Sequence, residues 1–284
     1  MNERSHRLVV GVCGALPNRQ ALELAAEMAR LFSARMSALL IEDGASDALG
    51  AIPFAREYIA HSATGWRDIH SGEMAVRRES ARRRARALFD QIAAAQGLTS
   101  DFETVGAAAD LSRAVAAYDI VALTPSEHAR DWMALPFASL AQAALHARAA
   151  TLIVPSRIAR RRGPIAALLD AHDYAAVDMA AQLARAADEN LVLLASDFEA
   201  GRDLDALAAR AAMPSHRLRI LDIDGAGLDV ITRTLGAIGE RALVLGRGYL
   251  PHPGIERLIR LAATRGAPVI IPGATEAAPQ TQAD

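Results

Sequence analysis

Short apolar runs recur along the chain, and segments with helical periodicity separate them. Runs such as 7–13 and 165–169 show no polar alternation, which is typical of strands buried on both faces of a parallel sheet. In the helical segments apolar residues recur three and four positions apart. The predicted strands are 7–13, 36–41, 102–105, 120–123, 151–154, 165–169, 191–195, 218–223, 242–245 and 269–271. The predicted helices are 19–33, capped by Asn18, then 73–96, 111–117, 137–147, 174–187, capped by Asp173, 204–212, 228–238 and 255–264.

The order of these elements repeats once along the chain. Residues 7–154 and 164–271 each alternate strands and helices, and each stretch closes on a short apolar strand that ends in proline. The two closing segments are Thr151–Pro155 and Pro268–Pro272. Short connections between alternating strands and helices require right-handed crossovers and parallel pairing. The sequence therefore predicts an α/β protein with two tandem open, mostly parallel five-stranded sheets that carry helices on both faces.

The duplication also predicts where the domains begin and end. We expect a first domain over 1–156, an arginine-rich linker over 157–163 that acts as a soluble hinge, and a shorter second domain over 164–273. The polar tail 274–284 has the composition of a disordered segment. Residues 43–70 have no clear period and several glycines, so we expect a long loop there with room for a short helix.

Composition narrows the functional classes. The 284 residues include 31 basic and 33 acidic side chains, and every basic one is arginine. The absence of lysine excludes a P-loop or Schiff-base lysine. The net charge of −2 gives no whole-molecule case for binding nucleic acid or an anionic membrane. The single cysteine, Cys13, forms no internal disulfide and suits a cytoplasmic location, and no apolar run is long enough to span a membrane.

The strand order and the strand ends resemble the universal stress protein family in its tandem two-domain form. The fourth strand of each half, Asp119–Leu123 and Leu243–Gly246, carries this resemblance together with Leu168–Asp170 at the end of a first strand. The resemblance implies a Rossmann-like fold related to the adenine-nucleotide alpha hydrolases. It also implies an Asp at the end of the first strand that holds the base, and a Gly-x2-Gly-x9-Gly-Ser/Thr segment that wraps ribose and phosphates through backbone amides.

The first half departs from this family pattern. Cys13 stands where the resemblance expects the Asp, and Thr124 and Glu127 stand at the first two glycine positions. Phe137 and Ala138 follow where the last glycine is expected. A carboxylate and bulky side chains at these positions oppose a triphosphate. We therefore expect the nucleotide motif of the first half to be lost.

The second half keeps more of the pattern. Asp170 ends the first strand, and Gly246 with Gly248 flanks Arg247 in a turn that would suit an anion, although Tyr249 takes the second glycine position. His172 lies between Asp170 and Asp173 at a strand's carboxyl end, where open sheets bind ligands. The competing interpretation is a helix cap and a turn that needs positive φ. The candidate cofactor-binding residues are Asp170, His172, Gly246, Arg247, Gly248 and Gly254.

No catalytic or metal site is predicted. The eight histidines form no metal-binding pair, and the chain has no Gly-x-Ser-x-Gly elbow. The helix 73–96 carries six arginines, for which a solvated face is the simplest interpretation and a basic face for nucleic acid or an acidic partner is the alternative.

Two functional hypotheses follow. One is a non-catalytic stress-response scaffold or signalling module with largely decayed ATP sites, no expected cofactor and an unknown protein partner. It would act as a homodimer or as an intrachain pseudo-dimer that pairs its closing strands. The alternative is an adenine-nucleotide sensor that binds ATP or AMP in the second domain only. Slow ATP hydrolysis is a distant third possibility, because no general base stands beside a metal site.

Overall fold

The fold described here is that of a computed structural model of the chain. The described residues are 7–13, 18–41, 52, 56–58, 65–68, 71–105, 115, 119–124, 144, 149–169, 174–195, 202–223, 228–249 and 255–273. The predicted helices 111–117 and 137–147, the cap at Asp173 and the tail 274–284 lie outside this set, apart from the isolated residues 115 and 144.

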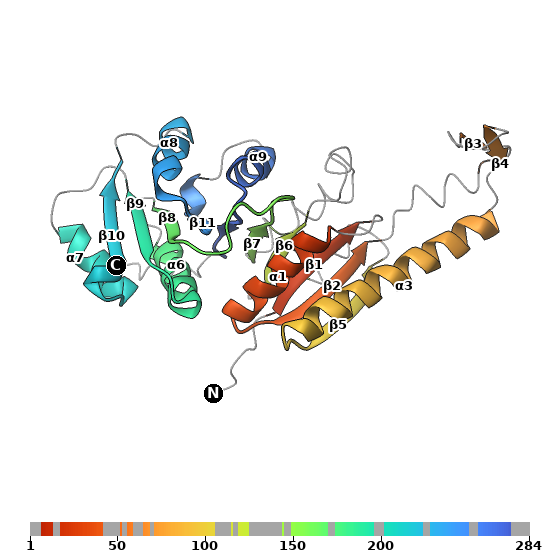
Figure 1. Ribbon diagram of the computed structural model, residues 1–284, viewed down its shortest axis with the longest axis horizontal. Helices are drawn as coiled ribbons and strands as arrows, with labels where there is room; N and C mark the ends of the chain where they lie inside the picture. Colours follow the sequence, from red (N-terminus) through yellow and green to blue (C-terminus); the bar gives the residue numbers. More distant parts are fainter. Residues whose placement is uncertain are drawn as a thin grey trace, which may run out of the picture.

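The strands of both halves form one continuous ten-stranded sheet (Figure 1). The order across it is β10-β9-β8-β11-β12-β7-β6-β1-β2-β5. In the first half the strands are β1 (Arg7–Cys13), β2 (Arg35–Ile41), β5 (Ser100–Val105), β6 (Ile120–Leu123) and β7 (Ala150–Ile153). In the second half they are β8 (Ile165–Leu169), β9 (Leu191–Ala195), β10 (Leu218–Asp222), β11 (Ala242–Leu245) and β12 (Val269–Ile271). The α/β class and the parallel pairing within each half are thus confirmed.

The two halves meet at their closing strands. β12 pairs antiparallel with β7, with Leu152 opposite Ile270, whereas every other neighbouring pair in the large sheet is parallel. The antiparallel pair turns one half relative to the other by about half a turn, as in a two-fold dimer. The sequence allowed the closing strands to pair either within one chain or between two copies. In the structure they pair within the chain.

Both faces of the sheet are covered by helices. One face packs against α1 (Arg19–Leu31), α3 (Ser71–Ala95), α6 (Tyr174–Ala187) and α7 (Arg202–Ala211). The other packs against α8 (Leu228–Ile238) and α9 (Ile255–Arg265). Alternate residues of a strand enter the two cores, so Leu8 and Val10 face the first core and Val9 faces the second. This is why the predicted strands read as continuous apolar runs.

The cap and the apolar periodicity predicted for the first helix are confirmed. The Asn18 side chain accepts hydrogen bonds from the backbone N–H groups of Gln20 and Ala21, as predicted for the start of α1. The apolar stripe predicted for this segment is buried, including Leu22 and Ala25 in α1 and Phe32 directly after it. This helix ends two residues earlier than predicted, because Phe32 serves as its C-cap.

The segment 43–70 differs from the prediction. Its described residues hold two short antiparallel strands, β3 (Arg56–Tyr58) and β4 (Trp66–Asp68), and no short helix. These strands pair only with each other and form a separate two-stranded sheet beside the N-terminal end of α3 (Figure 1). The alternation of polar and large residues in three-residue strands is too short to be visible as a period.

The linker is not a free hinge. The Ala159 N–H donates to the Gly266 carbonyl, and the Gly163 N–H donates to the Glu189 carboxylate. Gly163 has a φ of 131°, which side chains rarely adopt, and a Cβ there would lie 2.8 Å from the Gly239 carbonyl oxygen. The linker is therefore packed along the second half. These contacts fix the backbone that carries the linker arginines.

Candidate functional site

The predicted anion-binding turn follows β11, at the carboxyl edge of the second half. The Gly246 N–H donates to the Leu168 carbonyl at 3.0 Å, which continues the pairing between β11 and β8 by one residue. Gly246 is buried, and the described glycines with positive φ do not include Gly246 or Gly248. The chain turns here through a short 3₁₀ helix over Arg247–Tyr249. The interpretation as a turn that needs positive φ is therefore wrong, and the Gly246 amide serves the sheet.

Arg247 has a different role from the one that the sequence suggested. Its Nε donates to the Pro272 carbonyl at 2.8 Å, and its Nη2 donates to the Ala149 carbonyl at 3.2 Å. Pro272 follows β12 and Ala149 precedes β7, so the guanidinium bridges the two halves beside the antiparallel pair. A half-buried cation that binds protein carbonyls cannot also present those N–H groups to a phosphate. Gly248 is the one predicted residue among the described ones that is exposed at this edge.

The rest of the predicted cluster lies outside the described residues. This applies to Asp170, His172 and Gly254, and also to Asp173. Their place relative to Gly248 stays a prediction that rests on Leu169 being the last residue of β8.

In the first half, the position that matches the first glycine is filled by a buried side chain. Thr124 directly follows β6, and its hydroxyl donates to the Gly11 carbonyl of β1 at 3.4 Å. The contact directs the Thr124 hydroxyl into the sheet. Glu127 and the residues around 137 lie outside the described set, as does the side chain of Cys13.

The opposite edge of the sheet carries a cluster of charges that the sequence did not reveal. Arg241 immediately precedes β11, and its guanidinium pairs with Glu27 of α1 and, at 3.6 Å, with Glu189 before β9. We call Glu27, Glu189 and Arg241 the junction cluster. The Arg241 side chain is only 8% exposed, and its Nε has no hydrogen-bond partner within the described part of the chain. The cluster ties a helix of the first half to two strands of the second.

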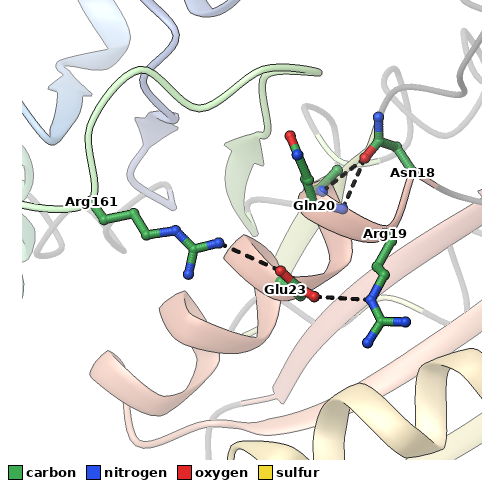
Figure 2. Close-up of polar contacts among 6 residues, drawn as sticks. Asn18, Arg19, Gln20, Glu23 and Arg161 are labelled. Carbon is green, nitrogen blue, oxygen red and sulfur yellow. Dashed lines mark hydrogen bonds and ion pairs between the residues drawn. The ribbon is translucent and has the colours of Figure 1, made fainter.

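A cavity of about 540 Å³ lies beside the junction cluster. Its lining residues are Glu27, Arg161, Arg162, Ala187, Asp188, Glu189 and Arg241. Three carboxylates and three guanidinium groups balance each other, and several pair with one another. Arg161 of the linker also reaches Glu23 on the same α1 helix at 3.5 Å, as Figure 2 shows. The positive and negative charges of the lining residues cancel. The cavity therefore resembles an interface between the two halves in its chemistry.

A second buried ion pair occupies the same edge in the first half. Arg7 at the start of β1 donates to Asp119, with Nη2 2.8 Å from Oδ2 and Nε 3.3 Å from Oδ1. The hydrogen bond to Asp119 raises the pKa of the Arg7 guanidinium above its ordinary value. A comparable pair joins Arg265 to the fully buried Glu240, whose hydrogen bond raises the pKa of Arg265. Sequence alone suggests such pairs only through the rule that a buried charge needs a partner.

Metal chemistry has no support in the described residues. They contain no group of three or more His, Cys, Asp or Glu side chains arranged to hold a metal ion. No helix among them is long and apolar enough to cross a membrane.

Comparison with known proteins places the fold. No protein-family model and no curated protein matches the chain. Among solved structures it resembles a universal stress protein from Archaeoglobus fulgidus DSM 4304, with a TM-score of 0.62 and 11% identity over 95% of this chain and 97% of that one. It also resembles the cytoplasmic domain of a prokaryotic cation chloride cotransporter, with a TM-score of 0.51 and 12% identity over 94% and 95% of the two chains.

A third solved structure gives a lower score. It is a putative universal stress protein from Pseudomonas aeruginosa UCBPP-PA14, with a TM-score of 0.48 and 14% identity over 95% of this chain and 92% of that one. At such identities likeness reports architecture alone. The chain therefore has the fold of the universal stress proteins along nearly its whole length, and the resemblance seen in its strand ends is supported at the level of fold.

Proposed function

We propose that this chain is a non-catalytic scaffold or signalling module of the stress-response type, in which both nucleotide sites have largely decayed. One observation carries the proposal. At the turn after β11 the Gly246 amide pairs with β8 and the Arg247 guanidinium binds two carbonyls. These groups would otherwise be the donors for phosphate oxygens. In the first half the matching Thr124 hydroxyl is likewise directed into the sheet.

The joined sheet supports a scaffold role. Pairing of β7 with β12 and the bridge from Arg247 hold the two halves as a pseudo-dimer. We propose an unidentified protein partner in the cytoplasm, with further assembly into a homodimer as a second possibility. The function requires no cofactor.

The alternative is a sensor that binds ATP or AMP in the second half only. Gly248 is exposed after β11, and Asp170 is the next residue in the chain after Leu169, the last residue of β8, which is compatible with this alternative. Such a site would hold the ligand through Asp170 and the amides around Gly248, without Gly246 or Arg247. It predicts a ligand smaller or more weakly held than a fully wrapped triphosphate.

The deciding experiment is native mass spectrometry of the purified protein, followed by thermal shift with AMP, ADP and ATP. We expect an empty protein and no shift. A stabilisation of about 1 kcal/mol would raise the melting temperature by roughly 2–4 °C for a chain of this size and would overturn the proposal. If Asp170→Ala abolishes that shift and the exposed control Asp205→Ala retains it, the second-half sensor is established.

A separate variant tests the structural role of Arg247. Arg247→Gln removes both carbonyl contacts, and each charge-assisted hydrogen bond contributes about 1.5 kcal/mol or more. We expect a lower melting temperature that is the same with and without nucleotide. If the melting temperature without nucleotide is unchanged and nucleotide binding is lost, Arg247 binds the nucleotide and has no structural role.

A further inference from the structure

The N-terminal half of α3 projects from the body of the protein. Figure 1 shows the helix extending past the sheet, with β3 and β4 at its far end. The C-terminal half is anchored, because Ala85, Phe89 and Ile92 are buried and the Phe89 ring meets the edge of Phe102 with centroids 6.2 Å apart. From 72 to 84 none of the side chains that the structure describes is buried. We call residues 72–84 the arm.

The arm is strongly basic. It carries five exposed arginines against two glutamates, and the arginines are Arg77, Arg78, Arg82, Arg83 and Arg84. Successive helical residues are turned by about 100°, so these five positions surround the helix instead of lining one face. Glu79 neutralises part of this charge through Arg83 at 2.7 Å and Arg82 at 3.9 Å. Five arginines against two glutamates still leave the arm with a net formal charge of +3.

This pattern argues against three kinds of protein partner. A helix that docks in an apolar groove needs a continuous apolar stripe, and the described arm offers only Val76 as a large apolar side chain, 70% exposed. The arm of a second copy carries the same charge and would be repelled. A partner helix with an acidic face would satisfy the arginines on one side only. The arm therefore fits an anion that can contact it from several sides.

We propose that the arm binds duplex nucleic acid through the phosphate backbone, without reading its sequence. The major groove is about 12 Å wide and admits an α-helix, and phosphates then flank the helix on both sides. An arm of 13 residues (72–84) spans about 20 Å, along which a duplex carries roughly twelve phosphate charges. Charges farther away than about 10 Å are screened at 0.1 M salt, so the projecting arm acts independently of the net charge of −2.

The projection changes the interpretation of the arginine run. The sequence favoured a solvated face, since an amphipathic helix normally lies along its own domain and turns its charges outward. In the structure the arm extends past the sheet, and all five of its arginines are exposed. The strand β4, whose Trp66 side chain is exposed, lies at the same end of the molecule.

The test uses fluorescence anisotropy with the full chain and a labelled duplex of about 25 base pairs, at 50, 100 and 200 mM NaCl. We expect a Kd in the range of about 1–100 µM at 100 mM salt, as for other non-specific binding. The triple variant Arg82→Gln, Arg83→Gln and Arg84→Gln should bind at least tenfold more weakly. It should also reduce the slope of log K against log salt by about 2–3. Glutamine keeps the helix propensity close to that of arginine, and circular dichroism checks that the helix remains.

A matched triple variant controls for net charge. Arg233→Gln, Arg257→Gln and Arg260→Gln change three exposed arginines on α8 and α9, with the same charge difference. We expect this control to bind within twofold of the unmodified protein. Equal loss in both triple variants would overturn the arm as the site. Equal affinity for single-stranded DNA, or for polyglutamate of matched charge, would contradict binding in the groove of a duplex. Absence of binding at 50 mM salt would overturn the whole proposal.

Discussion

The two halves place opposite charges at the same structural position. In the first half Asp119 directly precedes β6, and in the second Arg241 directly precedes β11. The pairing registers make the positions equivalent, since Leu8 lies opposite Ile120 in one half and Ile165 opposite Ala242 in the other. Asp119 finds its partner, Arg7, within its own half. Arg241 pairs with Glu27, from the first half, and with Glu189.

The difference follows from what stands at the start of the first strand. The position of Arg7 in the first half is taken by Pro164 in the second, and proline has no side chain that can pair with a charge. The backbone N–H of Arg241 donates to the Pro164 carbonyl, and the Arg241 side chain pairs with Glu27 on α1. The first half thus keeps a self-contained ion pair, and the second half uses the matching position to hold the halves together.

The largest effect is expected from removing the charge at the junction. Arg241→Met removes the cation that pairs with both Glu27 and Glu189, and loss of one member of a buried pair costs about 3 kcal/mol. We expect this loss in chemical unfolding, with a broader or split transition because the halves lose a tie. Arg210→Met is the control, since its pair with Asp178 is exposed and contributes under about 1 kcal/mol. Equal losses in the two variants would contradict a special role for the junction.

The matching change in the first half should be smaller and local. Asp119→Asn removes the charge from a fully buried carboxylate, while Arg7 is 13% exposed and regains some hydration. We expect a loss of about 2 kcal/mol with a single unfolding transition. The double variant Arg7→Met with Asp119→Leu should recover part of that loss, because it leaves no charge buried. Failure of the double variant to recover any stability would show that Asp119 acts through other contacts.

The packed linker gives a third test. Gly163→Ala brings a Cβ to within 2.8 Å of the Gly239 carbonyl oxygen at a φ of 131°, so we expect a loss of about 2 kcal/mol. Gly236→Ala in α8 is the control, since nothing lies within 4 Å of its Cβ and alanine favours a helix by about 1 kcal/mol. A linker that acts as a free hinge would make both changes neutral or stabilising.

The smallest effect concerns an exposed pair, far from the junction. The hydrogen bond from Arg83 lowers the pKa of Glu79 below its ordinary value. A lowered carboxylate pKa contributes stability above the ordinary value of about 4.3, and that contribution is lost as pH falls through the lowered pKa. An NMR titration should find the lowered pKa, and Arg83→Gln should move it back toward the ordinary value. An unchanged titration in that variant would show that Arg83 is not the cause.

Local pattern was enough for most of the fold. Apolar runs such as 165–169 and 242–245 became β8 and β11 with the predicted bounds, and α6 and α8 match their predicted ranges. In these elements the side chains buried on one face recur with a period of two in strands and 3.6 in helices. Such periods are visible in short stretches of sequence. The pairing of β3 with β4 was missed because each strand has only three residues.

The candidate site was less predictable. Gly246 and Arg247 were correctly placed after the fourth strand of the second half, but their donors turned out to serve Leu168, Pro272 and Ala149. A motif identifies residue types that could bind a phosphate. It does not show which backbone carbonyl the fold brings within reach of the same donor.

The sequence by itself determined the duplication, the α/β class, the parallel halves and the absence of lysine chemistry, because each depends on residue type or short-range periodicity. Only the tertiary structure decided that the halves join through β7 and β12, that Arg241 meets Glu27 across 214 positions of the chain, and that the arm of α3 extends past the sheet. These features arise from contacts between distant segments. Such contacts depend on where the whole sheet places each strand end, and no local pattern records that.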